Sequence, residues 1–528
     1  MHHPYVSRPL RLLPLAFAAT ALLGCASQPG PAAAPAPAAA VQVPVEAIVR
    51  PDGETPQWWY RAGAAHAAGN GALSGKARNV ILFLGDGMSL TTVAAARILE
   101  GQRKGGPGEE NLLSWERFPQ TAFSKTYNTD SQTPDSAGTM TAITTGVKTH
   151  AGAIGVAAGK RNDCADSLGK HRLTWLHLAD AAGMATGIVT TARLTHATPA
   201  STWAHSPDRN WESDADLPAQ AVAEGCVDIA RQMVATPYGS GPKVMFGGGR
   251  SKFLPATTPD PEYPDRRGER RDGRNLIEEW KASHPGGVFV WNRQQLEQAA
   301  DAPAVLGLFE PDHMQFDHDR DRAAEPSLAE LTAEAIRRLS AEPNGFVLMV
   351  EGGRIDHANH YGNAFRALDE TISLSEAVRT AAQMTSAEDT LIIVTADHSH
   401  TLNFVGYPAR GNPILDKVRD GDGDTARDAT GLPYTTLSYA NGPGYTGASR
   451  QQPAGPKRFP HIPTGYQPAA GRPDLEQVDT TAPDFMQESL LPLASESHGG
   501  DDVGIWARGP GASALRGTME QNTIFHVI

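Results

Sequence analysis

Four short runs of β-branched and apolar residues, each ending abruptly in polar residues, constrain the fold of this chain most strongly. Runs so continuously apolar are typical of central strands that are buried on both faces. Longer stretches with helical spacing lie between them, such as residues 327–339 and 363–385. This alternation predicts an α/β fold with a mostly parallel central sheet and helices on both faces. The four runs are residues 79–87, 186–193, 346–353 and 390–398.

The ends of these runs carry side chains that can bind ligands. Three runs end in acidic or imidazole groups, and the remaining run is followed closely by two more candidate donors. In a parallel sheet, ligands bind beyond the carboxyl ends of the strands. We therefore expect one edge of one sheet to hold the whole set, which is Asp86, His196, Thr198, Glu351, Asp397 and His398.

The N-terminal segment is typical of an export signal. Residues 1–24 contain arginines followed by an apolar core that is too short to span a bilayer. The residues before Cys25 resemble a bacterial lipobox, which predicts cleavage there and lipidation of Cys25; a plain secretory signal is the alternative. Residues 25–50 are rich in Pro and Ala and predict a tether. The chain is thus expected to be exported and lipid-anchored at the periplasmic face or the cell surface of a bacterium.

The remaining chain, residues 51–528, is interpreted as one domain. At about 150 residues per domain the length allows more, but α/β folds often exceed that size. Residues 403–495 differ in character, because Gly, Pro and Tyr crowd this stretch and periodicity is weak. We interpret it as a loop-rich insertion.

The cysteines add a covalent constraint. With Cys25 lipidated, Cys164 and Cys226 remain as an even pair in an oxidising compartment, where a disulfide is expected. On the chain-entropy model such a bridge would stabilise the fold by roughly 4 kcal/mol. Two buried free thiols are the alternative.

The net charge of the chain limits the kinds of molecule that it is expected to bind. The chain carries 46 basic and 59 acidic residues, a formal charge of −13. This balance argues against a nucleic-acid-binding surface, since phosphate backbones require a basic face. An anionic substrate would therefore need a local source of positive charge.

Metal ions are a natural source of that charge. Asp356 and His360 are four residues apart and share one helical face if their segment is helical. Carboxylate and imidazole donors together suit zinc, whereas the oxygen set Asp86, Glu351 and Thr198 suits magnesium. Each residue alone is more often a surface group. Gathered at one edge, however, the carboxylates would repel one another without cations.

Ser136 is the candidate nucleophile. It lies just after a proline and opens a stretch of small residues that predicts a helix start, where free N–H groups favour an alkoxide or a bound anion. A simple helix cap at Asp135 or Ser136 is the alternative. Arg209 has the fork geometry to hold two phosphate oxygens, although a lone arginine is usually a surface charge.

Taken together, the chain resembles the alkaline phosphatases from about Asp52 to Ile528. The motifs that carry the resemblance occur in the family's order. They are Gly85–Met88, Pro134–Gly138, His196–Pro199, Asp208–Trp211, Glu351–His357, Thr395–His400 and Ser497–Asp502. Further stretches look like the animal branch of the family, namely residues 247–250, 258–264, 307–311 and 442–445.

The resemblance implies a role for each matching residue. It implies two zinc ions and one magnesium ion, with Ser136 as nucleophile and Arg209 as phosphate clamp. The implied reaction is broad-specificity phosphomonoester hydrolysis through a phosphoserine and a zinc-bound hydroxide, releasing inorganic phosphate. The implied ligands are Asp356, His360 and His498 for the first zinc, Asp86, Asp397 and His398 for the second, and Asp86, Glu351 and Thr198 for magnesium.

Residues around these ligands follow the animal pattern. His196 and His357 stand where short bacterial members typically carry Asp and Lys, and with Asp135 they are expected to support the metals and phosphate indirectly. Animal members also have a calcium site. The matching groups here are Glu262, the carbonyl of Phe309, Glu310 and Glu325, with Glu325 in place of the usual Asp.

The resemblance further implies a homodimer. Trp58 and Trp59 lie in an N-terminal segment that either packs on a partner or belongs to the chain's own core. The animal enzymes carry a C-terminal lipid anchor, whereas membrane attachment here is expected through Cys25. Two competing functions stay open: a phosphodiesterase or sulfatase of the wider superfamily, and a non-catalytic phosphate-binding surface lipoprotein.

Overall fold

A computed structural model describes residues 44–45, 53–235 and 239–528. The expected signal segment 1–24 and the lipidation site Cys25 lie outside the described residues, as does nearly all of the tether. Within the described part of the chain, no helix has the length and apolar character needed to cross a membrane.

The centre of the fold is a ten-stranded sheet with the order β17-β2-β16-β8-β1-β7-β3-β4-β6-β5. Within this sheet β16 alone runs antiparallel to its neighbours, β2 and β8. The mostly parallel sheet expected from the sequence is therefore confirmed. The strands are β1 Asn79–Gly85, β2 Gln120–Lys125, β3 Ala185–Arg193, β4 Val244–Gly248, β5 Val288–Val290, β6 Val305–Leu308, β7 Phe346–Gly352, β8 Thr390–Ala396, β16 Val503–Arg508 and β17 Gly517–Glu520.

Helices cover both faces of the sheet. Successive side chains of each strand point to opposite faces, so the apolar strand β1 contributes to a buried cluster on each face. Ile81 and Phe83 of β1 pack with one buried cluster, which includes residues of α2, α11 and α13. Val80, Leu82 and Leu84 pack with the other, which includes residues of α3, α5 and α9. The helices are α1 Pro56–Gly69, α2 Leu90–Arg103, α3 Ser136–Thr145, α4 Cys164–Ser167, α5 Trp175–Ala181, α6 Ala197–Ala200, α7 Ala219–Ala223, α8 Ile229–Val234, α9 Leu276–Ser283, α10 Arg293–Gln298, α11 Leu328–Leu339, α12 Arg354–His360, α13 Ala364–Met384 and α14 Thr523–Val527.

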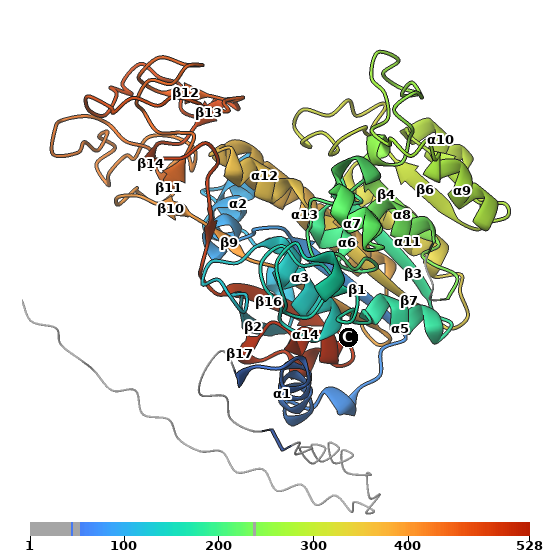
Figure 1. Cartoon of the computed structure of the whole chain (residues 1–528). Helices are drawn as coiled ribbons and strands as arrows, with labels where there is room; N and C mark the ends of the chain where they lie inside the picture. The colour runs from blue at the N-terminus through green and yellow to red at the C-terminus, as the bar shows by residue number, and fades with distance from the viewer. Residues whose placement is uncertain (1–43, 46–52, 236–238) are drawn as a thin grey trace, which may run out of the picture. The chain divides into compact units, whose positions relative to one another are not determined.

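The segment between β8 and β16 contains only short strands and long loops. Figure 1 shows its small strands β10 to β14 gathered together, in orange and red. Strands β10, β11 and β14 form one small sheet, β12 and β13 a second, and β9 and β15 a third. Their bounds are β9 Ser399–His400, β10 Leu402–Phe404, β11 Leu437–Gly442, β12 Lys457–Arg458, β13 Phe485–Met486, β14 Ser489–Pro492 and β15 His498–Gly499.

Two local expectations from the sequence can be followed in the structure. Cys164 and Cys226 form a disulfide, as predicted. Trp59 is buried in a small cluster with Val147 and Ala157 of its own chain, which supports the interpretation of this residue as core.

Candidate active site

The carboxyl ends of the central strands bring three acidic groups to one place. Asp86 directly follows β1, Asp397 directly follows β8, and Glu351 is the penultimate residue of β7. The parallel register aligns Leu84 with Glu351, which sets these strand ends side by side. All three carboxylates are fully buried. Such a concentration of buried acids requires compensating positive charge.

One donor set surrounds the end of β8. The Nε2 atom of His398 lies 3.3 Å from Oδ1 of Asp86 and 3.5 Å from Oδ2 of Asp397. The Oγ atom of Ser136 lies 3.1 Å from the same Nε2 atom and 3.4 Å from Oδ1 of Asp86. The structure therefore brings together the residues that the sequence assigned to the second zinc, with the candidate nucleophile beside them.

A second donor set is built on α12. Asp356 and His360 lie on one face of this helix, as their spacing predicts, with Nε2 of His360 3.3 Å from Oδ1 of Asp356. His498 comes from β15, and its Nε2 atom lies 3.4 Å from the same oxygen and 3.1 Å from Nε2 of His360. These are the three residues assigned to the first zinc, and they also converge.

The histidine tautomers suit metal binding. In His360, His398 and His498, the Nδ1 atom faces a backbone carbonyl oxygen, at 2.5, 3.2 and 2.7 Å respectively. A carbonyl oxygen only accepts, so each Nδ1 carries the hydrogen and donates it. The Nε2 lone pair is then free for a metal, which is the usual arrangement of metal-binding histidines.

The third donor set contains only oxygen atoms near Asp86. The hydroxyl of Thr198, in α6, lies 3.4 Å from Oδ2 of Asp86. Glu351 accepts a hydrogen bond from Thr190 through one oxygen, while its other oxygen, Oε1, is buried and has no hydrogen-bond partner among the described residues. An oxygen-only set with an unsatisfied carboxylate oxygen fits magnesium.

The raised pKa values of Glu351 and Asp397 show that their negative charges are not compensated by nearby positive charge. Burial, together with the charge of Asp86, raises the pKa of Glu351 well above its usual value and that of Asp397 to about 7. Oδ2 of Asp397 is likewise buried and has no hydrogen-bond partner in the described part of the chain. Divalent cations in the two sets would satisfy both oxygens, one ion binding each, and would relieve the repulsion. The residues present therefore fit the expected metals.

Ser136 is the first residue of α3, and Asp135 caps that helix by accepting a hydrogen bond from the N–H of Gly138. The other carboxylate oxygen of Asp135 lies 3.2 Å from Nη1 of Arg209. Against the effect of burial, the charge of Arg209 lowers the pKa of Asp135. Asp135 thus does cap the helix, as the alternative interpretation held, and it also holds Arg209 beside the nucleophile.

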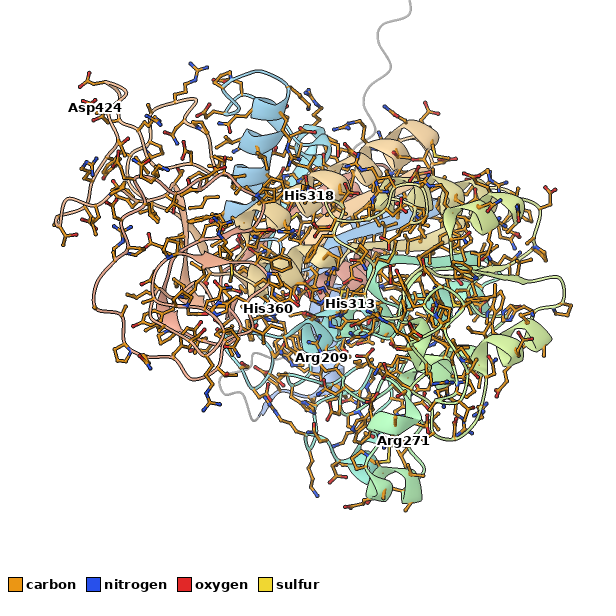
Figure 2. All side chains as sticks on the ribbon, turned by 90° about the horizontal axis from the view of Figure 1, so that it is seen from above. Arg209, Arg271, His313, His318, His360 and Asp424 are labelled. Carbon is orange, nitrogen blue, oxygen red and sulfur yellow. A yellow bond between two sulfur atoms is a disulfide. The ribbon has the colours of Figure 1, made fainter. Side chains whose placement is uncertain are left out.

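Three histidines gather on the side of Arg209 away from Asp135. His196 lies 3.0 Å from Nη2 of Arg209, and its ring contacts those of His313 and His357. Figure 2 labels His313, Arg209 and His360 in the middle of the view. His196 and His357 were predicted as supporting residues, whereas His313 was missed, since nothing in its local sequence marks it.

The structure adds two further residues that the sequence did not assign. The Nε2 atom of His400 lies 2.8 Å from Oδ1 of Asp356, and its Nδ1 atom lies 2.5 Å from Oε2 of Glu496. His400 belongs to the quoted motif Thr395–His400, so its closeness to Asp397 and His398 was a usable signal. Glu496 precedes His498 by two residues, but its side-chain direction depends on the folding of the loop.

The expected calcium ligands share one region without forming a tight cluster. Glu262 accepts a hydrogen bond from Arg250, and Glu310 accepts one from Tyr263. Burial, with the charges of Glu310 and Glu262, raises the pKa of Glu325 to about 8. The Oε1 atom of Glu325 is buried, and no described residue forms a hydrogen bond with it. The fourth expected ligand residue, Phe309, is also buried.

The sequence of this chain is similar to those of a known protein family. The family model "Alkaline phosphatase" matches residues 77–528. Curated relatives include the tissue-nonspecific alkaline phosphatase isozymes of Gallus gallus, 44% identical over 86% of this chain and 84% of the relative, and of Homo sapiens, 42% identical over 86% and 83%. An alkaline phosphatase of Gadus morhua is 43% identical over 86% and 91%.

Solved structures show the same fold. The alkaline phosphatase of Thermus thermophilus superposes with a TM-score of 0.61 and 25% identity over 86% of this chain and 91% of that one. The enzyme of the Antarctic bacterium TAB5 gives 0.55 at 21% identity, covering 86% and 97%. The higher identity to the vertebrate proteins agrees with the animal-type motifs. The chain therefore belongs to the alkaline phosphatase family, and the enzyme is an alkaline phosphatase.

Proposed function

We propose that this enzyme is a metal-dependent phosphomonoester hydrolase of broad specificity that works through a phosphoserine and releases inorganic phosphate. The observation that carries the proposal is the position of Ser136. Its Oγ atom lies at the N-terminus of α3, within 3.4 Å of both Asp86 and His398, beside buried carboxylate oxygens that lack partners.

The residues described above would hold two zinc ions and one magnesium ion. Asp356, His360 and His498 would hold one zinc; Asp86, Asp397 and His398 would hold the other; Asp86, Glu351 and Thr198 would hold magnesium. When bound, these ions supply positive charge that lowers the pKa of the Ser136 hydroxyl and stabilises the leaving oxygen. Calcium near Glu325 is a further part of the proposal.

The chain's own residues then account for the chemistry. Ser136 Oγ releases its proton to solvent and attacks phosphorus, so that an O–P bond forms while the bond from phosphorus to the alcohol oxygen breaks. The departing alkoxide takes up a proton from solvent and leaves as the alcohol. Water then loses a proton and attacks the phosphoserine from the opposite side, the serine O–P bond breaks, Ser136 Oγ regains a proton, and phosphate leaves. The N–H groups at the start of α3 favour the charge on the phosphoryl oxygens.

Arg209 is proposed to bind two of the phosphoryl oxygens. Its guanidinium is oriented by Asp135 on one side and His196 on the other, at 3.2 and 3.0 Å. Such a held fork loses little conformational freedom when it binds phosphate. Asp135 and His196 therefore position the clamp, and neither needs to touch the substrate.

The test compares hydrolysis of 4-nitrophenyl phosphate and of bis(4-nitrophenyl) phosphate, with and without a metal chelator. We expect a higher kcat/KM on the monoester and loss of activity in chelator that added zinc and magnesium restore. A higher kcat/KM on the diester would assign the protein to the phosphodiesterases. Full activity after removal of zinc would contradict the proposed metal sites, and phosphate binding without turnover would indicate the non-catalytic function.

We also propose that the enzyme is a homodimer. The loop-rich segment exposes several large apolar side chains, and where such side chains form one contiguous patch they mark a protein-protein contact. Analytical ultracentrifugation should give twice the mass of one chain, and a monomer at micromolar concentration would contradict this proposal. The exposed residues are Phe404, Tyr407, Leu490, Leu491 and Leu493.

Export and lipidation at Cys25 complete the proposal. The residue lies outside the described part of the chain, so support comes from the sequence pattern alone. Mass spectrometry of the protein purified from bacterial membranes should find a diacylated or triacylated N-terminal Cys25. Release of the Cys25→Ala variant from the membrane fraction is the corresponding functional result.

A further inference from the structure

Glu496 is almost completely buried, at 1% exposure, in the loop between β14 and β15. This position is two residues before His498 and directly against the C-terminal end of α12. A carboxylate is rarely buried so fully without bonded partners. Each polar part of Glu496 does have a partner: His360 belongs to the candidate metal site, His400 contacts that site, and Thr401 follows His400 in the sequence.

The backbone of Glu496 holds His360. Its N–H donates to the carbonyl oxygen of His360 at 2.9 Å, and its own carbonyl oxygen accepts from Nδ1 of the same residue at 2.5 Å. The pair of contacts fixes both the ring orientation and the tautomer of His360. It leaves Nε2 directed at Oδ1 of Asp356 and at Nε2 of His498.

The side chain of Glu496 holds His400. Oε2 lies 2.5 Å from Nδ1 of His400, while Oε1 accepts hydrogen bonds from the N–H and the hydroxyl of Thr401 at 2.7 and 2.5 Å. On its other edge, His400 places Nε2 2.8 Å from Oδ1 of Asp356. Both ring nitrogens of His400 thus face carboxylates. In His360, His398 and His498, by contrast, Nδ1 faces a backbone carbonyl and the Nε2 lone pair is available to a metal.

The backbone around His400 is shaped for this contact. Strand β9 pairs with β15 so that His400 lies opposite His498. Gly87, in the turn after Asp86, has a φ of +64°, and a Cβ atom there would lie 2.3 Å from the ring of His400. Only a glycine therefore leaves room for the ring to reach Asp356.

We propose that Glu496 is a positioning residue that aligns the donor set of Asp356, His360 and His498, acting on His360 through its backbone and on Asp356 through His400. This inference rests on the proposed function, because it assigns zinc to that donor set. One residue sets the direction of two donors and stands two positions from the third. Residues that orient metal ligands in this way typically change metal affinity by about 10- to 100-fold when they are removed.

The experiment measures zinc binding and not only turnover. The full-length enzyme is stripped of metal, and its zinc affinity is measured by competition with a chelator for wild type, Glu496→Ala, His400→Ala and the double variant. Glu488→Ala is the matched control, since Glu488 is a partly buried acid of the same loop-rich segment whose ion pair with Arg472 lies elsewhere. Glu496→Gln is measured alongside, so that a folded variant is at hand if the alanine variant does not fold.

We expect Glu496→Ala to weaken one of two zinc equivalents about 10- to 100-fold and to leave the other nearly unchanged. The double variant should bind zinc no more weakly than His400→Ala alone, because the side chain acts through His400. Glu488→Ala should bind zinc as wild type does. Unchanged zinc affinity in the Glu496 variants, or additive losses in the double variant, would overturn the inference.

Failure of the inference can be separated from failure of the proposed function. If the wild-type enzyme does not hydrolyse 4-nitrophenyl phosphate, the proposed function is wrong whatever the zinc affinities are. If the wild type is active and Glu496→Ala keeps both its zinc affinity and its kcat/KM, the positioning role alone is wrong. A purely structural role would lower the melting temperature of the metal-free protein while leaving the affinities of the two zinc equivalents unchanged.

Discussion

The Nε2 atom of His398 lies 3.1 Å from the Oγ atom of Ser136, although the two residues are 262 positions apart in the sequence. The contact joins the carboxyl end of β8 to the N-terminus of α3. It places a hydroxyl group at the edge of a donor set in which Asp86 and Asp397 also take part. A nucleophile held there is next to the positive charge that metal ions would bring, which is the basis of the first prediction.

Replacing Ser136 with Ala removes the proposed nucleophile and leaves the surrounding carboxylates and histidines in place. We expect kcat to fall by at least about 10³-fold, as is typical when the nucleophile of a covalent mechanism is lost. The inhibition constant for inorganic phosphate should change only a few-fold, since Arg209 is intact. Steady-state kinetics on 4-nitrophenyl phosphate measures both. A kcat within tenfold of wild type would exclude Ser136 as nucleophile.

Asp135→Asn tests the orientation of Arg209. The amide can still cap α3 through its oxygen, but its N–H₂ group cannot accept a hydrogen bond from the guanidinium. We expect kcat/KM to drop about 10- to 100-fold, mainly through a higher KM. Asp130→Asn is the control, because the ion pair of Asp130 is with the exposed Arg161 and not with Arg209. Equal kinetics for both variants would show that Asp135 serves only as a helix cap.

Calcium binding near Glu325 predicts an effect on stability. The buried, unpartnered Oε1 atom of this residue is a ready oxygen donor for a hard cation. Adding Ca²⁺ to chelator-treated wild type should raise the melting temperature by several degrees, and Glu325→Gln should abolish most of that rise. The exposed Glu297→Gln should respond as wild type does. A wild-type melting temperature that is insensitive to millimolar Ca²⁺ would rule the site out.

The sequence predicted those parts of the site that local patterns determine. Strand ends in a parallel sheet meet at one edge, so the order of residues along the chain was enough to group Asp86, Glu351 and Asp397. The spacing of Asp356 and His360 depends on helical geometry alone. In both cases the geometry of a regular element, a parallel sheet or an α-helix, makes it possible to predict from the sequence which side chains lie close together.

Residues held by irregular segments escaped prediction for the same physical reason. His313 lies in the loop after β6, where the other predicted ligands belong to the calcium site, and its place beside His196 depends on how that loop packs. Glu496 acts on His360 through backbone atoms, and a hydrogen bond accepted by a backbone carbonyl places no constraint on the residue type. Strand β16 lies antiparallel between β2 and β8. This pairing joins segments that are far apart in the sequence, so the hydrophobic periodicity of each segment alone cannot predict it.

A stack of histidines that shares no residue with the three donor sets predicts how stability depends on pH. The ring of His205 stacks on that of His171 with centroids 4.5 Å apart and on that of His177 at 5.7 Å. Burial, with the charge of His171, lowers the pKa of His205 to about 3, and burial lowers that of His177 to about 4. In the unfolded chain both pKa values lie near 6.5.

Between about pH 6.5 and the folded pKa values, the unfolded chain binds more protons than the native protein, so stability must fall as pH decreases. His205→Gln removes one titrating group but keeps a donor for the carbonyl of Arg172, which His205 now contacts at 2.8 Å. From about pH 6 to about pH 4, the variant should lose roughly 2 kcal/mol less unfolding free energy than wild type. Urea titrations in chelator measure this difference, because metal release is then the same in all samples. The exposed His318→Gln should lose as much as wild type, and an equal loss in His205→Gln would show that protonation of the stack does not destabilise the fold.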